Sequence, residues 1–413
     1  MEPTTLFAII IAILIANYVI DTFLDHLNAR LYNTAIPDLL ADVYDPEAYE
    51  KSQRYKATSY RFSVLSQAVS FVAVLLFFFL DGFAFVDEWV RQFSDNDIVI
   101  ALLFFGVIIV ASSLLSLPFS YYSTFVIEQE FGFNKATKTT FFLDKIKGAL
   151  LSAVVGGGLL ALIILIYQKT GDNFWWYAWV VVTVFTVFMN FFYARLFVPI
   201  FNKQTPLPEG SLRDKISQYA ASVGFTLSKI YVIDGSKRST RANAYFSGFG
   251  REKRITLYDT LIDDLSEEQI VAVLAHEVGH YKRHHIIINL VISVLLTGFT
   301  LWLFSLFVNN QLLSAALNVE IPSFHIGLIT FGILYTPISE ATGLIMNYLS
   351  RKFEFQADDF AATTFDGPPL IEALKALAKN NLSNLTPHPA YVVAHYSHPP
   401  LLKRFKNILK HSS

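Results

Sequence analysis

The chain has 413 residues, of which 53% are hydrophobic and 16% are charged, and its mean hydropathy is +0.43. This apolar fraction exceeds that of ordinary soluble domains and predicts a membrane protein. A formal net charge of -2 gives no reason to expect a nucleic-acid partner, and the lack of cysteine excludes disulfides, thiolate metal ligands and cysteine nucleophiles.

Seven apolar runs are long enough to cross a bilayer as helices, so the lipid bilayer is the first expected partner. The runs lie near residues 5–23, 64–85, 98–120, 149–167, 176–196, 286–308 and 325–349. The seventh contains Glu340, whose ionisable side chain we expect to face a polar interior instead of lipid. The predicted fold class is therefore mostly α, with seven transmembrane helices.

Basic residues alternate between the segments that connect these runs. There are five in 24–63, one in 86–97, four in 121–148, one in 168–175 and none in 309–324, whereas 197–285 and the tail are rich in them. Since basic loops tend to stay in the cytoplasm, this pattern places the N-terminus outside and both basic regions inside.

The sequence thus divides into four predicted parts: 1–196 with five spans, 197–285 as a soluble segment, 286–349 with two spans, and 350–413 as a cytoplasmic tail. The soluble segment is expected to be a small α+β domain. A Pro- and Gly-containing linker precedes a helix that begins at Ser211, and strands are expected at 229–234, 242–249 and 253–258.

Residues 266–285 are predicted to form one helix that runs directly into the sixth span, with Ser266 in a capping box. His276 and His280 are four residues apart, so their rings project from one face and can share a tetrahedral zinc ion. Glu277 lies next to that face and can act as general base on a water that the zinc activates. The alternative is an amphipathic helix with two solvated histidines, which the apolar surroundings disfavour.

Glu354 and Asp358 follow the seventh span and are four apart on an expected helix. Two carboxylates on one face suit a metal ligand and an acceptor that orients a ligating imidazole. The alternative is a solvated acidic face that pairs with Arg351 and Lys352. Two histidines with one glutamate form a recurrent catalytic zinc set, so we expect one zinc ion per chain.

The C-terminal region contains His395-Tyr-Ser-His-Pro-Pro, followed by Arg404. This stretch is either a loop before the last helix or the source of a histidine or arginine that stabilises an oxyanion. His284 and His285 are expected to be interfacial, and we assign them no role.

These motifs resemble those of the type I CAAX prenyl endopeptidases, which are integral-membrane zinc metalloproteases. The matching stretches are 271–281 around His-Glu-Val-Gly-His, 350–361 around Glu-Phe-Gln-Ala-Asp, 242–248 around Asn-Ala-Tyr, 128–138 around Glu-Phe-Gly-Phe-Asn-Lys, and 395–400. Together with the order of the spans, the resemblance covers nearly the whole chain.

The resemblance implies a ring of seven helices that encloses a water-filled chamber, with the zinc site near its cytoplasmic end. It implies His276, His280 and Glu354 as ligands, Glu277 as catalytic base, and Asp358 as the acceptor behind the ligands.

The resemblance also implies that His398 assists catalysis and that Arg404 lies at the substrate. Asn243, Ala244 and Tyr245 would lie on an edge strand that pairs with the substrate backbone, which binds extended peptides with few side-chain demands.

The predicted activity is that of a zinc endopeptidase, and its expected partner is a peptide or protein substrate, prenylated or not. The alternative class is a seven-span transporter or lipid-handling protein with a structural metal, although a structural zinc is usually closed by four protein ligands. A bacterial inner membrane is favoured over an endoplasmic reticulum, because the tail carries no recognised retrieval signal. A monomer is compatible with this site, and the sequence does not predict the oligomeric state.

Overall fold

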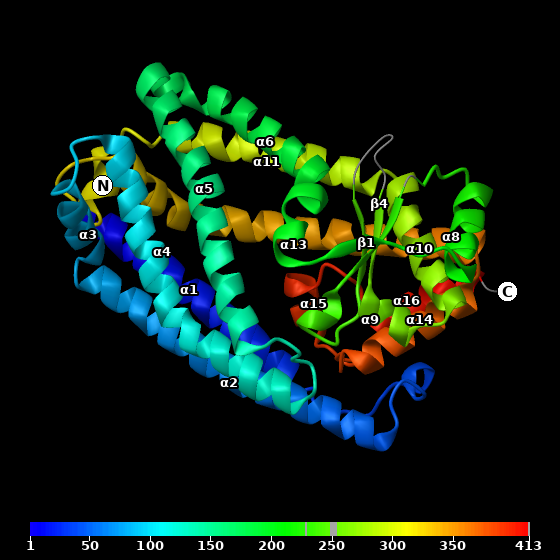
Figure 1. Ribbon diagram of the computed structural model, residues 1–413. Helices are drawn as coiled ribbons and strands as arrows, with labels where there is room; N and C mark the ends of the chain where they lie inside the picture. Colours follow the sequence, from blue (N-terminus) through cyan, green and yellow to red (C-terminus); the bar gives the residue numbers. More distant parts are fainter. Residues whose placement is uncertain (228, 248–253, 412–413) are drawn as a thin grey trace.

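The computed structural model describes residues 1–227, 229–247 and 254–411, which are mostly helical and include one small sheet (Figure 1). The long helices are α1 (Pro3–Ala29), α2 (Pro46–Phe79), α4 (Asp97–Tyr122), α5 (Lys138–Thr170), α6 (Phe174–Leu196), α11 (His285–Ser305) and α13 (Phe324–Thr364). The shorter helices are α3 (Gly82–Arg91), α7 (Val198–Phe201), α8 (Ser211–Ser222), α9 (Asp259–Asp264), α10 (Glu267–Lys282), α12 (Gln311–Ala315), α14 (Gly367–Asn380), α15 (Pro389–His395) and α16 (Leu401–Ile408).

Six apolar helical stretches within the described residues are long enough to cross a membrane. One of them, Lys138–Phe201, contains both α5 and α6, which are separated by a turn at Gly171–Asn173 and pack against each other. The chain reverses direction between these two helices (Figure 1). The fourth and fifth expected runs therefore correspond to two helices within one apolar stretch, and the count of seven spans stays a prediction.

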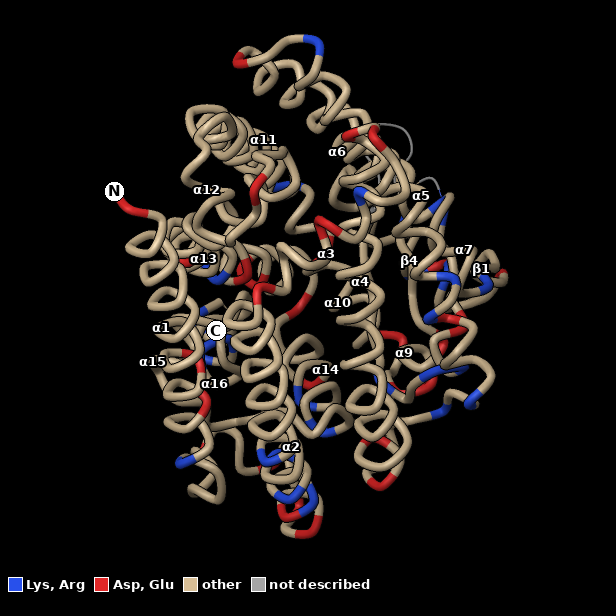
Figure 2. Tube along the Cα trace, turned by 90° about the vertical axis from the view of Figure 1, so that its left-hand side faces the viewer, with Lys and Arg blue, Asp and Glu red and all other residues tan. Residues whose placement is uncertain are grey.

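The second expected run, 64–85, is divided in the structure. The helix α2 begins much earlier, at Pro46, and ends at Phe79, and α3 follows after a sharp turn. Asp81 adopts a φ of 53° at this turn, which a continuous helix cannot accommodate. Figure 2 shows that the long helices carry few charged residues along their length, whereas charges gather at their ends and around the sheet.

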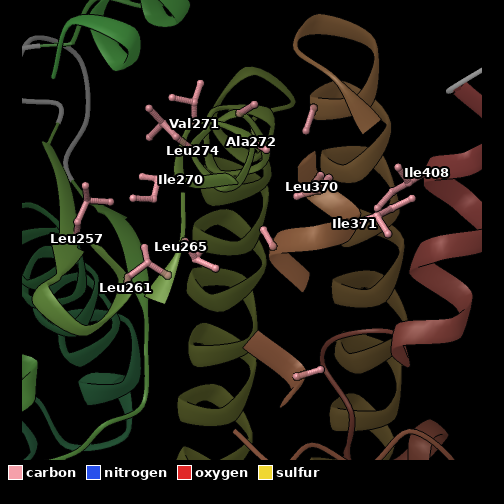
Figure 3. Close-up of a cluster of buried hydrophobic side chains, with 14 of the residues drawn as sticks. Leu257, Leu261, Leu265, Ile270, Val271, Ala272, Leu274, Leu370, Ile371 and Ile408 are labelled. Carbon is pink, nitrogen blue, oxygen red and sulfur yellow. The ribbon is translucent and has the colours of Figure 1, made fainter. Parts of the chain in front are cut away.

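Buried apolar side chains form clusters at the two ends of the long helices. At one end, Phe104 and Ile326 belong to a cluster that joins α1, α3, α4 and α13, and Phe174 and Phe304 belong to a second that joins α6 and α11. The largest cluster lies at the opposite end, in the α+β domain, and is shown in part in Figure 3. Between these ends, only 6–17% of the residues in each apolar window are buried.

The sheet has the strand order β1-β2-β4-β3, and the strands are β1 (Gln204–Pro206), β2 (Lys229–Ile233), β3 (Ala244–Ser247) and β4 (Arg254–Tyr258). The central pair β2 and β4 is parallel, and each outer strand is antiparallel to its neighbour. All three predicted strands are present, but the second begins at Ala244 instead of 242, so Asn243 precedes the strand on which it was expected. Residues 248, 249 and 253 lie outside the described residues. The strand β1 was expected to be linker, and its Pro206 is tolerated because β1 is an edge strand.

The helix α10 packs tightly on the C-terminal half of α13. A Cβ atom on Gly279 would lie 3.1 Å from both the Cα and the carbonyl oxygen of Ala357, so a larger residue would push the two helices slightly apart. The predicted continuity of α10 with the sixth span is wrong, because α10 ends at Lys282 and α11 begins at His285. His284 lies between them with a φ of 60°, a left-handed conformation that interrupts a right-handed helix.

Candidate metal centre

The helix α10 begins with the predicted capping box. The Ser266 hydroxyl accepts from the Gln269 N–H, and the Gln269 side chain accepts from the Ser266 N–H at 2.8 Å. Buried Ile270 and Leu274 fix the orientation of the helix in the core (Figure 3). His276 and His280 therefore project from a firmly held helix, and their Nε2 atoms lie 3.1 Å apart.

The helix α13 brings Glu354 to these two histidines. Its Oε1 lies 3.3 Å from His280 Nε2, and its Oε2 lies 3.5 Å from His276 Nε2. One potential ligand atom from each of His276, His280 and Glu354 lies within 4.8 Å of the others. The structure thus brings together the three residues that were predicted to be metal ligands.

The donor set fits a zinc ion. Glu354 Oε2 is buried and has no hydrogen-bond partner among the described residues, a costly arrangement that a cation would relieve. The two imidazole Nε2 atoms lie 3.1 Å apart and both face the Glu354 carboxylate, so a single cation bound between these three groups would take the place of a shared proton. Two nitrogen ligands and one oxygen ligand leave a fourth tetrahedral position open.

The acidic-face alternative for Glu354 and Asp358 is wrong, because their residues are only 5% and 0% exposed. Arg351, the proposed partner of such a face, instead donates to backbone carbonyl groups, including that of Val392 at 3.0 Å. The two carboxylates are thus buried and are not solvated surface charges.

Asp358 lies behind the metal cluster and links two of its neighbours. Its Oδ1 accepts from Nδ1–H of His276 at 2.9 Å, which leaves His276 Nε2 with its lone pair directed at the cluster. Its Oδ2 accepts from the Nε–H of Arg404 at 2.9 Å. Arg404 Nη1 also lies 3.5 Å from Glu354 Oε2, so the guanidinium neutralises this buried acidic pair.

Glu277 lines the same cavity as His276 and Glu354, which has a volume of about 240 Å³. Among the described residues its carboxylate makes no hydrogen bond or ion pair, so it is available to a water molecule or a substrate. Burial raises the pKa of the Glu277 carboxyl above its ordinary value, although the nearby histidines oppose this shift. A raised pKa makes a carboxylate a more effective general base at neutral pH, because the best pKa for a general base lies near the working pH.

His398 and Arg404 line the cavity from the C-terminal region. His398 Nε2 is 3.3 Å from Glu354 Oε1. The Ser397 hydroxyl is 2.9 Å from His398 Nδ1 and can donate to it, so that Nδ1 accepts and Nε2 carries the proton of the neutral ring. The structure thus leaves His398 with an N–H donor beside the metal cluster.

The edge strand β3 reaches the cavity at its N-terminal end. Asn243 and Ala244 line the cavity, whereas the side chain of Tyr245 lines a different one beside Tyr193 of α6. Of the four predicted substrate-binding residues, Asn243, Ala244 and Arg404 therefore line the cavity of the metal cluster, whereas the Tyr245 side chain does not.

Sequence reasoning missed three residues at this site. His285 Nδ1 lies 3.0 Å from His280 Nδ1, and Gln356 Oε1 lies 2.8 Å from His285 Nε2. Asn381 lines the cavity, and its side-chain oxygen is buried without a hydrogen-bond partner among the described residues. The only sequence signal was the position of Gln356 between Glu354 and Asp358, within a motif already singled out.

The chain is similar to known proteins along nearly its whole length. Residues 26–203 match the family described as "CAAX prenyl protease N-terminal, five membrane helices", and residues 206–412 match "Peptidase family M48". It is 38% identical over 408 residues to the CAAX prenyl protease 1 homolog of Oryza sativa, which covers 96% of this chain and 95% of that protein. It is 35% identical over 402 residues to CAAX prenyl protease 1 of Saccharomyces cerevisiae, with coverages of 91% and 88%.

The fold is also similar to a solved structure. The crystal structure of S. mikatae Ste24p matches with a TM-score of 0.93 and 34% sequence identity, over 98% of this chain and 99% of that chain.

Proposed function

Because this chain belongs to the CAAX prenyl proteases of peptidase family M48, we propose that it uses one zinc ion to hydrolyse peptide bonds near the C-terminus of its substrates. It is an integral multi-pass membrane metalloendopeptidase. The observation that carries the proposal is the buried cluster of His276, His280 and Glu354, with Glu277 in the same cavity. Family membership excludes the alternative of a transporter or lipid-handling protein with a purely structural metal.

His276 and His280 would hold the zinc ion through Nε2, and Glu354 through its carboxylate. When bound, zinc supplies a Lewis acid that polarises the scissile carbonyl and lowers the pKa of a nearby water. Glu277 takes the proton of the attacking water on its carboxylate and transfers it to the leaving amine. Burial in a small cavity excludes bulk water and strengthens these electrostatic interactions.

The Nε2–H of His398 is placed to donate to the oxyanion that develops on the substrate carbonyl, since it lies beside Glu354 and lines the cavity. Arg404 contributes from behind the ligands. Its guanidinium holds Asp358 and adds positive charge near the same carbonyl.

The substrate backbone would bind to the open edge of β3. The backbone carbonyl of Asn243 accepts from Tyr258 N at 3.0 Å, so Asn243 and Tyr245 direct their backbone groups towards β4. In an antiparallel ladder the residue between them, Ala244, directs its N–H and C=O to the opposite side. The Ala244 N–H donates to Asn243 Oδ1 at 2.8 Å. A backbone carbonyl of the incoming substrate would replace this side-chain oxygen as the acceptor.

We further propose that seven helices enclose a chamber and that the metal lies on the cytoplasmic side. The chamber is supported by apolar clusters that join the helices at their ends, while few residues are buried along the spans. The cytoplasmic side is supported by the alternation of basic residues between the spans. Location in an inner membrane, as opposed to an endoplasmic reticulum, stays a prediction.

The substrate class follows from the relatives, which are named as CAAX prenyl proteases. We propose that the substrate is a peptide or protein with a Cys-a-a-X terminus, which binds mainly through its backbone at β3. A prenyl chain on this cysteine would add affinity through the surrounding membrane-spanning helices.

The proposal can be tested with the full-length protein in lipid nanodiscs and one Cys-a-a-X peptide in farnesylated and unmodified forms. We expect cleavage that depends on zinc, and a loss of about 10²- to 10⁴-fold in Glu277→Gln with unchanged zinc content, because the glutamine cannot accept a proton. Glu268→Gln, on the exposed first turn of the same helix, is the matched control. Near-normal turnover by zinc-loaded Glu277→Gln would contradict the mechanism, and equal cleavage of both peptides would remove the prenyl group from the proposal.

A further inference from the structure

The ring of His280 has a different partner on each side. Its Nε2 faces the cluster, 3.1 Å from His276 Nε2 and 3.3 Å from Glu354 Oε1. Its Nδ1 lies 3.0 Å from Nδ1 of His285, a residue of the next helix. A contact between two imidazole nitrogens at this distance needs one proton, so one ring donates and the other accepts.

His285 is itself held in place. Its residue is 2% exposed, and its ring stacks on Phe353 with a centroid distance of 4.2 Å and an interplanar angle of 12°. Its Nε2 lies 2.8 Å from Gln356 Oε1. Because an amide oxygen only accepts, His285 Nε2 carries a proton, and in the neutral ring Nδ1 is then an acceptor.

These contacts determine the tautomer of His280. With His285 Nδ1 as acceptor, His280 donates from Nδ1–H and keeps the lone pair of Nε2 directed at Glu354 and His276.

The backbone break between α10 and α11 makes this contact possible. In a continuous helix, residues five apart are rotated by about 140° and their side chains diverge. His284 adopts a φ of 60°, a left-handed conformation that is unfavourable for a non-glycine residue, and it redirects the chain so that His285 faces His280. The strained backbone at His284 thus allows the hydrogen bond between His280 and His285 to form.

We propose that His285 is a positioning residue of the metal centre, which is fixed by Gln356 and holds His280 in the tautomer that can bind zinc. The proposal rests on the proposed metal site. It gives α13 a second task, because Asp358 orients His276 directly, whereas Gln356 orients His280 through His285. Both imidazole ligands would then be set by side chains of the helix that also supplies Glu354.

The test is the zinc affinity of the full-length protein, measured by competition with a chelator, with the visible spectrum of the cobalt-substituted protein as a second readout. His285→Phe keeps a ring against Phe353 but has no acceptor, and we expect its zinc affinity to fall about 10- to 100-fold with a changed cobalt spectrum. His285→Asn places a carbonyl oxygen near the former Nδ1 and should recover most of the affinity. His284→Asn is the matched control, because asparagine tolerates a positive φ and the exposed His284 ring contacts no ligand.

Gln356→Leu tests the same link without changing either ring, and it covers the case in which His285→Phe fails to fold. We expect a similar loss of affinity, whereas Gln356→Glu, which keeps the acceptor, should retain it. Affinities within twofold of wild type in both His285→Phe and Gln356→Leu would overturn the proposal. A wild-type protein that binds zinc but cleaves no peptide would contradict the proposed function and leave this inference standing.

Discussion

Replacing Asp358 by leucine should weaken both the fold and the metal site, for two separable reasons. The side chain of Asp358 is 0% exposed, and that of Arg404 is 11% exposed. Leucine keeps the branching of aspartate but leaves the buried guanidinium without its main partner. Breaking a buried pair in this way costs about 3–5 kcal/mol. We expect a loss near 3 kcal/mol, because Glu354 Oε2 still lies 3.5 Å from Arg404.

The same change removes the acceptor of the His276 Nδ1–H. The imidazole then loses both its orientation and its tautomer, and we expect zinc affinity to fall about 10- to 100-fold. Stability is measured as thermal unfolding of the metal-free protein in detergent, and affinity by competition with a chelator. Asp359→Leu, at the neighbouring half-exposed carboxylate, is the matched control.

The double variant Asp358→Leu with Arg404→Met separates the two effects. Replacing both members of a buried ion pair by apolar side chains is often neutral, so stability should largely recover. Zinc affinity should stay low, because His276 still lacks its acceptor. If the double variant recovered zinc affinity together with stability, Asp358 would act only through Arg404, and the orientation argument would be refuted.

Four further results are expected. Glu354→Ala should strip the zinc and abolish cleavage, and stoichiometric zinc of unchanged affinity in elemental analysis would remove Glu354 from the ligand set. A cysteine at Asn309 should react with a membrane-impermeant thiol reagent in intact cells, whereas a cysteine at Ser236 should not, and the reverse labelling would invert the proposed orientation. Asn243→Ala should lower kcat/KM by about 3- to 10-fold, the value of one hydrogen bond, with zinc content intact. A proline scanned through the peptide should block cleavage at one position or more, since proline has no N–H to give β3, and uniform cleavage of all these peptides would argue against strand addition.

The local parts of the site were predictable from the sequence because they depend on helical spacing. The pair His276 and His280, and the pair Glu354 and Asp358, each lie four residues apart on one helix. The capping box at Ser266 is equally local. That the two helices meet is a long-range fact, for which sequence reasoning relied on the coordination chemistry of zinc and on a family resemblance. The packing that joins them depends on Gly279, whose close approach to Ala357 leaves no periodic signal.

The missed features have physical causes of the same kind. His285 was expected to be interfacial and was given no role. The left-handed conformation of His284 directs it towards His280, and such a conformation is too rare in histidine to be anticipated. The strand β1 has three residues and ends in Pro206, which reads as a linker until its pairing with β2 is known. The order of the sheet was out of reach, because the parallel pairing of β2 with β4 leaves β3 at the edge and involves residues far apart in the chain.

The length of α13 relates the position of the metal cluster to the thickness of the bilayer. At 1.5 Å per residue its 41 residues extend about 62 Å, roughly twice the thickness of a hydrocarbon core. Glu354 lies 30 positions beyond Phe324 on this helix, with Pro337 between them, so the position of the metal cluster relative to the bilayer depends on how α13 is tilted. A change in the acyl-chain length of the lipids alters the tilt of a membrane-spanning helix such as α13 through hydrophobic mismatch. For a substrate anchored in the same membrane, lipid thickness would then adjust which peptide bond reaches the metal.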